Sequence, residues 1–474
     1  MQWRWFELRT PHFNFTSCVL VPDVYNLAQR LERFHDAYAQ LAGSQAVASP
    51  PITVLAFPSH TTLTPFLPLY DGKPANLSGF FQRGSDENLI VVSFVRNNPA
   101  AMNVIYHEYT HLLFRRNENL WPLWLQEGMA EAYSTFEVSQ REVQIALPIP
   151  SHLRTLSEGS LIPVQTLMSV DHDSPMYNER EQQGMFYAEA WILTHYLMNG
   201  DNPLLKPRFH QFTPLLVQGQ TPEEAFTNSL GVTYAAIDRL LAHYIHQGVF
   251  PAVQCQVSAN LDTNHWSTAR FLTPVETAFR LGKELMRVKR VEDADLYFKK
   301  ALKMAPASPL PYEGLGLLAA DKTNHTEAVD WLKQSFDHHS TSFLAHTLYA
   351  QQKLDLAMDS EGRLGAMPGD VVRDIREHLI LSIESMPDYA TAHQLLGLLA
   401  LSQDHDYSEA SSQFTRVLEL QPENQSTQLF LAQSNFRSGN KTAALNTLEF
   451  LSQHAHNHDL KKEAEELLKE YKQR

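Results

Sequence analysis

The sequence predicts an α+β fold with a small mixed sheet near the N-terminus, a helical middle part and an all-α C-terminal part. Short apolar runs separated by Pro- and Thr-rich stretches characterise residues 1–98, as expected for the strands of a small sheet. Apolar residues at helical spacing dominate 99–250, and a period of about 34 residues runs through 273–474. Residues 251–272 fit neither pattern and are interpreted as a connector.

Composition limits the classes of protein to which the chain can belong. With 474 residues, two or three domains are expected, and 43% hydrophobic and 19% charged residues are typical of a globular protein. The formal net charge of -15 argues against a nucleic-acid partner, which a basic surface would attract. The two cysteines, Cys18 and Cys255, form no CxxC motif, so a bound metal would need histidine and carboxylate ligands.

The apolar stretches of the sequence are too short for a transmembrane helix, so no transmembrane segment is expected. Residues 1–17 contain neither the apolar core nor the cleavage site of a signal peptide. We therefore expect a cytoplasmic location if Met1 is the native start, and an exported protein if a leader was removed before it.

The first part is expected to contain four strands and one helix. The strands are expected at Phe13–Val21, Ile52–Phe57, Ser78–Gln82 and Asn88–Phe94, and the helix at Val24–Leu41. The last two strands would form a pair joined across 83–87.

The helical middle part is expected to begin with a helix from Pro99 to about Arg116, because proline is tolerated in the first helical turn. A break at Asn117–Pro122 separates this helix from a second one, which starts near Leu123 and continues past Tyr133. Further helices are expected at Gly184–Met198, Pro222–Asn228 and Thr233–Gln247.

The first predicted helix of the middle part contains the pattern HExxH at residues 107–111. His107 and His111 are four residues apart and share a helix face, so both imidazoles can reach one zinc ion. Glu108 lies beside the first histidine, where its carboxylate can take a proton from water. The alternative is a solvated or core-facing helix without a metal, with which the five residues alone agree equally well.

A second acidic pattern follows, in which fifteen residues separate His111 from Glu127 and Glu131 comes four residues later. A returning helix would bring Glu127 beside the two histidines, which gives three protein ligands and leaves a fourth position for water. Glu131 could then accept a hydrogen bond from a ligating histidine. The alternative is a solvated helix face, against which the apolar residues Trp124 and Met129 argue.

HExxH followed by W-L-x-E-G-x-A-E resembles the gluzincin zinc peptidases, and most of all short peptidase-MA-like proteins, over roughly residues 1–250. The resemblance implies a helical zincin catalytic domain with one Zn²⁺ per chain, bound by His107, His111 and Glu127. It further implies Glu108 as general base, Glu131 as the acid that supports a zinc ligand, and a peptide or protein substrate. The G-x-M-E-N motif of aminopeptidase N-like enzymes is missing, so aminopeptidase activity is not implied.

The group that stabilises the oxyanion of the reaction is not specified by a motif. Tyr187 is the candidate, because its hydroxyl could donate a hydrogen bond to the developing negative charge. His172 and His195 are rivals, and a tyrosine on an apolar helix is more often a core residue.

The periodic C-terminal part resembles the tetratricopeptide family over roughly 200 residues, with an ordinary helical bundle as the alternative. Small and large residues recur at fixed positions, and two later copies contain insertions before a polar capping helix at 460–472. The first two copies match at Leu281, Gly282, Ala294, Phe298, Ala301 and Pro306, and at Leu315, Gly316, Ala328, Leu332 and Ser335. The resemblance implies stacked hairpins with a concave groove that binds a protein partner.

Together these patterns predict a zinc metallopeptidase with repeats that bind a partner or the substrate. The strand pair at 78–94 could offer an edge to which an extended substrate adds. The alternative is a catalytically silent zincin-fold scaffold that acts through its repeats, although such a scaffold would not need Glu108. A structural zinc site fits poorly, because it needs four protein ligands and neither a cysteine nor a histidine is evident nearby as the fourth.

Overall fold

The structure is a computed structural model that describes most of the chain. The described residues are 3–42, 52–70, 72–75, 77, 79–82, 84, 86–94, 99–114, 121–139, 142–178, 180–256, 261, 263–359, 364–455 and 457–473. Residues 49–51, which belong to a Pro-rich stretch before the second predicted strand, and parts of the predicted breaks at 83–87 and 117–122 lie outside these residues.

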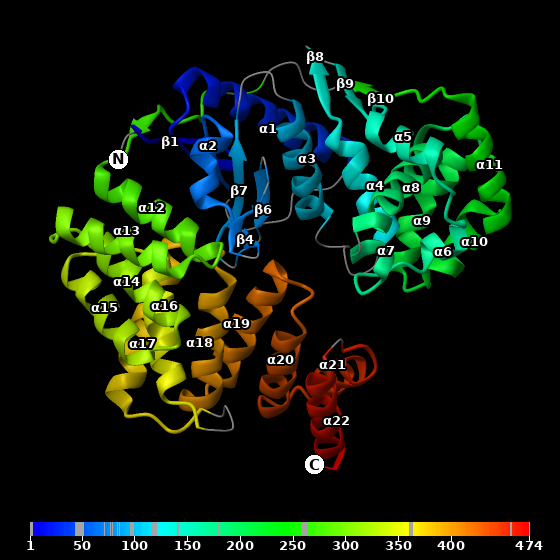
Figure 1. The fold of residues 1–474 in the computed structure, drawn as a ribbon. Helices are drawn as coiled ribbons and strands as arrows, with labels where there is room; N and C mark the ends of the chain where they lie inside the picture. Colours follow the sequence, from blue (N-terminus) through cyan, green and yellow to red (C-terminus); the bar gives the residue numbers. More distant parts are fainter. Residues whose placement is uncertain are drawn as a thin grey trace.

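A six-stranded mixed sheet with the order β11-β1-β2-β3-β7-β6 forms the core of the N-terminal part (Figure 1). Strands β2, β3 and β7 are parallel, and the other neighbours pair antiparallel. The strands are β1 (Phe6–Arg9), β2 (Phe13–Ser17), β3 (Ile52–Phe57), β6 (Gly79–Gln82), β7 (Asn88–Ser93) and β11 (Arg270–Phe271). The predicted pair formed by β6 and β7 is confirmed, and β6 lies at the edge of the sheet.

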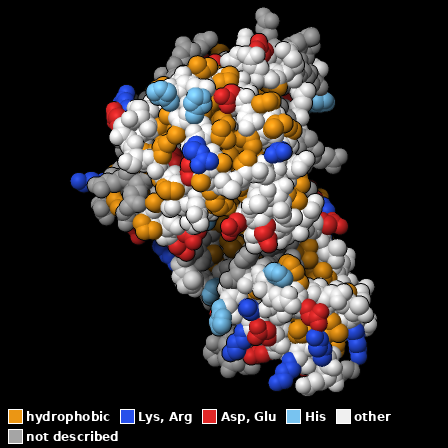
Figure 2. All heavy atoms as spheres, turned by 90° about the vertical axis from the view of Figure 1, so that its right-hand side faces the viewer, with side chains coloured by type: hydrophobic (Ala, Val, Ile, Leu, Met, Phe, Trp, Pro, Cys, Tyr) orange, Lys and Arg blue, Asp and Glu red, His pale blue; other side chains and the backbone are white. Residues whose placement is uncertain are grey.

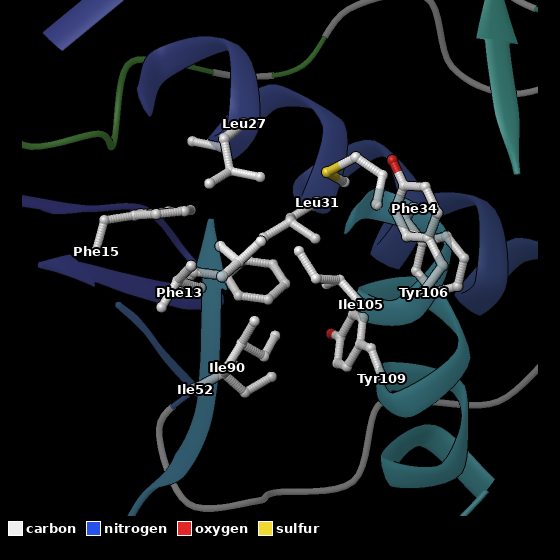
Figure 3. Packing of buried hydrophobic residues seen from close by; sticks show 14 of the residues in the cluster. Phe13, Phe15, Leu27, Leu31, Phe34, Ile52, Ile90, Ile105, Tyr106 and Tyr109 are labelled. Carbon is white, nitrogen blue, oxygen red and sulfur yellow. The ribbon is translucent and has the colours of Figure 1, made fainter. Parts of the chain in front are cut away.

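One face of this sheet is covered by the helices α1 (Val21–Ala42) and α3 (Pro99–Phe114). Alternate strand residues such as Ile90 point toward these helices, where they meet Leu31 of α1 and Ile105 of α3 (Figure 3). Short elements connect β3 to β6 at the border of the sheet. They are α2 (His60–Leu63), a 3₁₀ turn (Thr64–Phe66), β4 (Leu69–Tyr70) and β5 (Lys73–Pro74).

A helical lobe follows and is built around α8 (Arg180–Asn199), whose Trp191 is fully buried. Helix α4 (Leu123–Ser134) packs directly on α8. A Cβ atom on Gly128 of α4 would lie 2.2 Å from the carbonyl oxygen of Ala190 and from the hydroxyl of Thr194, so only glycine permits this close approach. The other helices of the lobe are α5 (Pro150–Glu158), α6 (Val164–Met168), α7 (Pro175–Asn178), α9 (Leu205–Val217), α10 (Pro222–Leu230) and α11 (Tyr234–Gln247).

The segment 251–272, predicted as a connector, contributes strands to two sheets. Strand β11 pairs with β1, and β10 (Val253–Gln256) joins β9 (Glu142–Ile145) and β8 (Glu137–Ser139) in a three-stranded sheet beside the lobe. These backbone pairings tie the segment to residues that precede it by more than one hundred positions.

Five helical hairpins and a final helix make up the C-terminal part of the described chain and form a curved stack (Figure 1). Their packing follows the predicted alternation of small and large residues. A Cβ atom on Gly282 would lie 2.4 Å from the ring of Phe298, and one on Gly397 2.7 Å from the ring of Phe414. The helices are α12 (Pro274–Arg287), α13 (Val291–Met304), α14 (Leu310–Asp321), α15 (His325–Asp337), α16 (Phe343–Leu356), α17 (Gly369–Ser385), α18 (Ala390–Leu399, extended by a π turn at Ala400–Asp404), α19 (Tyr407–Leu420), α20 (Gln425–Arg437), α21 (Lys441–His454) and α22 (His458–Gln473).

The first hairpin, α12–α13, covers the second face of the six-stranded sheet. Leu55 and Val91 point toward this face and pack with Leu281 and Phe298 of the hairpin. At the border of this contact, two acidic residues of the β6–β7 turn meet two basic residues of α12. The Lys283 Nζ–Glu87 Oε1 distance is 3.0 Å, and the Arg287 Nη2–Asp86 Oδ1 distance is 2.7 Å. The repeats are therefore joined to the sheet by both apolar and ionic contacts.

Two features of the surface bear on possible partners. None of the helices in the described part of the chain combines the length and apolar character that a bilayer span requires. Acidic and basic side chains are interspersed on the lower part of the face shown in Figure 2, which the C-terminal repeats form, whereas apolar side chains are more frequent above it.

Most predicted helices and strands are present, with differences at their ends. The strand predicted at Phe13–Val21 is wrong beyond Ser17, because helix α1 begins at Val21 and the amide of Val24 donates to the carbonyl oxygen of Leu20. Strand β1, the three-stranded sheet and several short helices of the lobe were not predicted.

We predict that Glu284→Gln stabilises the protein more at pH 8 than at pH 5. Glu284 of α12 is 2% exposed, and burial raises the pKa of its carboxyl to about 8. Between about pH 4.5 and 8 the unfolded chain is ionised while the folded protein keeps the proton, so the wild type loses stability as pH rises. The variant should gain about 1–3 kcal/mol at pH 8 and much less at pH 5, measured by urea unfolding. An equal gain at both pH values would contradict this.

Candidate metal centre

Helix α3 places its histidines on the side that faces away from the sheet. Ile105 and Tyr109 are buried against the sheet and α1, whereas His107, Glu108 and His111 are partly exposed on the opposite side. Helix α4 packs beside α3 and brings Glu127, which is 3% exposed, to the two histidines. The predicted approach of Glu127 to His107 and His111 is present in the structure.

Three atoms of these residues face one another at nearly equal distances. His107 Nε2 lies 3.3 Å from His111 Nε2 and 3.3 Å from Glu127 Oε2, and His111 Nε2 lies 3.4 Å from the same Glu127 oxygen. Zinc bonds of 2.0–2.2 Å in a tetrahedron separate the ligand atoms by about 3.3–3.6 Å. The three side chains thus fit a zinc ion without rearrangement.

The buried Glu127 carboxylate supports this fit. Its Oε2 is inaccessible to solvent and has no well-aligned hydrogen-bond donor among the described residues, which is costly unless a cation binds there. Burial raises the pKa of Glu127, but His107 and His111 more than offset it and hold the pKa at about 2. Conversely, burial lowers the pKa of His107, but Glu127 and Glu131 raise it to about 10. The site therefore favours a positive charge.

The outer oxygens of the two carboxylates contact residues that the sequence analysis missed. The Tyr177 hydroxyl donates to Glu127 Oε1 at 3.1 Å, so only Oε2 faces the histidines. Glu131 Oε1 lies 3.4 Å from His107 Nδ1, as predicted, and Glu131 Oε2 lies 3.1 Å from His152 Nε2. Tyr177 is in the short helix α7 and His152 in α5. Neither Tyr177 nor His152 belongs to a recognisable motif with the other site residues, so no sequence pattern indicates their role.

Tyr187 lies beside the histidines. Its ring centroid is 6.3 Å from that of His107 and 6.2 Å from that of Tyr177, on which the ring is stacked. Burial and the nearby Glu127 raise the pKa of Tyr187 far above its usual value, so its hydroxyl keeps its proton. Burial, Glu127 and, to a smaller extent, Glu108 raise the pKa of Tyr177 to about 12.

The two rival histidines lie in different surroundings. His172 is exposed, and its ring centroid is 5.4 Å from that of Tyr177. His195 is fully buried in the core of the lobe, where its Nδ1 is 2.9 Å from the Tyr244 hydroxyl. The interpretation of His195 as an oxyanion donor is therefore wrong, because its imidazole is enclosed by the core.

Comparison with known proteins identifies the C-terminal part. A model of the tetratricopeptide repeat family matches residues 279–335 and 395–449. The chain thus contains tetratricopeptide repeats, as predicted, and repeats of this type imply a protein partner. No curated protein matches the sequence.

Several solved repeat structures resemble part of the chain. YrrB, described as a TPR protein with an unusual peptide-binding site, has 18% sequence identity and a TM-score of 0.33, covering 40% of this chain and 90% of its own. TTC0263, a TPR protein of Thermus thermophilus, has 20% identity and a TM-score of 0.30, covering 41% and 98%. PilF of Pseudomonas aeruginosa has 16% identity and a TM-score of 0.33, covering 42% and 88%.

We predict that Tyr177→Phe weakens zinc binding while leaving the fold intact. The variant loses the hydroxyl that holds Glu127 Oε1, and the loss of such a supporting hydrogen bond raises the dissociation constant of zinc about 10–100-fold. Titration of zinc against a colorimetric chelator measures this change. Tyr70→Phe is the matched control, because Tyr70 is 72% exposed on strand β4. Equal zinc affinity of Tyr177→Phe and the control would show that the Tyr177 hydroxyl does not support the ligand.

Proposed function

We propose that the chain is a zinc-dependent metallopeptidase of the gluzincin type. The observation that carries the proposal is the convergence of His107 Nε2, His111 Nε2 and Glu127 Oε2 at the spacing of tetrahedral zinc ligands, one Zn²⁺ per chain. Glu108 is adjacent to His107 and partly exposed on the same side of α3, where substrate can approach.

In this proposal each residue of the site has a separate role in peptide hydrolysis. A bound zinc ion supplies Lewis-acid chemistry, which polarises a carbonyl group and makes water more acidic. Glu108 accepts the proton of the attacking water and delivers it to the leaving amine. Tyr187, whose ring lies beside those of His107 and Tyr177, donates the hydrogen of its hydroxyl to the developing oxyanion.

The edge strand β6 offers a place for the substrate backbone. It ends the six-stranded sheet and contacts α3, so its outer N–H and C=O groups lie near the helix that carries the histidines. An extended peptide can pair with such an edge and pass the zinc ligands. In this proposal the tetratricopeptide repeats bind either a protein partner or a further part of the substrate.

The principal test is the Glu108→Gln variant of the full chain. The substitution keeps the size and polarity of the side chain but removes the base, so zinc should remain at one equivalent while cleavage falls at least about 100-fold. Metal content is measured by elemental analysis and cleavage by mass spectrometry of a peptide library. Glu158→Gln, on the exposed face of α5, is the matched control and should behave as the wild type.

Two results would contradict the proposal. A wild-type protein without stoichiometric zinc and without cleavage of any library peptide would exclude the enzyme. A protein that holds zinc but cleaves nothing would favour the alternative, a silent scaffold that acts through its repeats.

A further inference from the structure

We infer that His152 is a positioning residue of the metal centre, which holds the Glu131 carboxylate and, through it, the His107 ring with Nε2 toward the zinc position. The inference rests on the zinc site of the proposed function. It adds a residue of α5 to a site whose proposed zinc ligands come from α3 and α4.

The Glu131 carboxylate lies between two imidazole rings. One oxygen is 3.4 Å from His107 Nδ1, and the other is 3.1 Å from His152 Nε2. All three side chains are largely shielded from water, with exposures of 15% for His107, 16% for Glu131 and 14% for His152. Imidazole nitrogens beside both oxygens favour the orientation in which the Glu131 carboxylate faces His107.

This arrangement selects one tautomer of His107. Its Nε2 faces His111 and Glu127, and it must be free of hydrogen to bind a metal. The ring hydrogen then resides on Nδ1, which faces Glu131, and a carboxylate can only accept a hydrogen bond. His152 lies on the far side of the same carboxylate, where its Nε2 is 3.1 Å from Oε2 without being aligned as a hydrogen bond in this structure, and we infer that it donates to this oxygen when the ring turns slightly. A fixed acceptor therefore fixes both the tautomer and the orientation of the ligand.

The fold holds His152 in place through the backbone that precedes α5. Ala146 has a left-handed conformation with φ 56°, and its amide donates to the carbonyl oxygen of Ala132, the residue after Glu131, at 2.8 Å. Helix α5 packs on α8, where the ring centroid of His152 lies 5.9 Å from that of Trp191. The start of α5 is thus tied to α4 beside the carboxylate that His152 contacts.

If His152 contributes only to packing, a different effect of its replacement on zinc affinity is expected. If His152 only filled space against Trp191, its replacement would change stability but not the affinity of the folded protein for zinc. If it positions Glu131, the effect on zinc must depend on a donor at the position of Nε2. The amide nitrogen of glutamine lies close to that position, whereas the shorter side chain of asparagine does not reach it.

The experiment measures zinc affinity of the full chain and its variants by competition with a colorimetric chelator, with circular dichroism as a check of folding. His152→Ala should raise the zinc dissociation constant about 10–100-fold, and His152→Gln should recover most of the loss, unlike His152→Asn. His210→Ala, at an exposed position of α9, is the matched control and should bind zinc as the wild type does.

A double-mutant cycle tests whether His152 acts through Glu131. In the Glu131→Gln background, His152→Ala should cause little further loss of zinc affinity. An equal loss in both backgrounds, or a folded His152→Ala protein with wild-type affinity, would overturn the inference and leave the metallopeptidase proposal standing. A wild-type chain that binds no zinc would overturn both.

Discussion

The close approach of α4 to α8 is the constraint on which the candidate metal centre depends. Gly128 allows this contact, because any larger residue would meet the backbone of Ala190 and the hydroxyl of Thr194. Glu127 immediately precedes this glycine and turns toward α3, while Glu131 lies one helical turn further along the same face. A wider separation of α4 and α8 would change the position of both carboxylates relative to His107. The apolar core of the lobe thus sets the distances between polar atoms at the site.

Burial and charge act together on these polar atoms. Two carboxylates and two imidazoles meet in a largely enclosed space, where unpaired charge is costly. Tyr177 and His152 contact the outer oxygens, and the remaining inner oxygen of Glu127 has no well-aligned donor among the described residues. A cation between the histidines and Glu127, as in the proposed zinc site, would complete this pattern.

The sequence predicted those parts of the molecule that depend on local spacing. HExxH and the returning acidic pattern define helix faces, and the repeats define pairs of small and large residues such as Gly282 and Phe298. Contacts between distant segments have no such local pattern. Strand β1 pairs with β11, more than 250 residues later, and His152 reaches Glu131 only because the chain folds back after β9. The sequence pattern therefore predicted a connector around β11, and it did not distinguish His152 from the histidines that have no role at the site.

The cover that α12–α13 provides for the sheet has a consequence for biosynthesis. Strand β1 leaves the ribosome before the other strands of its sheet but finds its partner β11 only after residue 271 has been made. The second apolar face of the sheet stays open until Met304 of α13 has followed. During that interval Leu55 and Val91 are without the side chains that bury them in the finished protein. The nascent N-terminal part thus exposes an aggregation-prone apolar surface until α13 has been synthesised. A chaperone that binds apolar surfaces could bind the nascent chain at this face during that time.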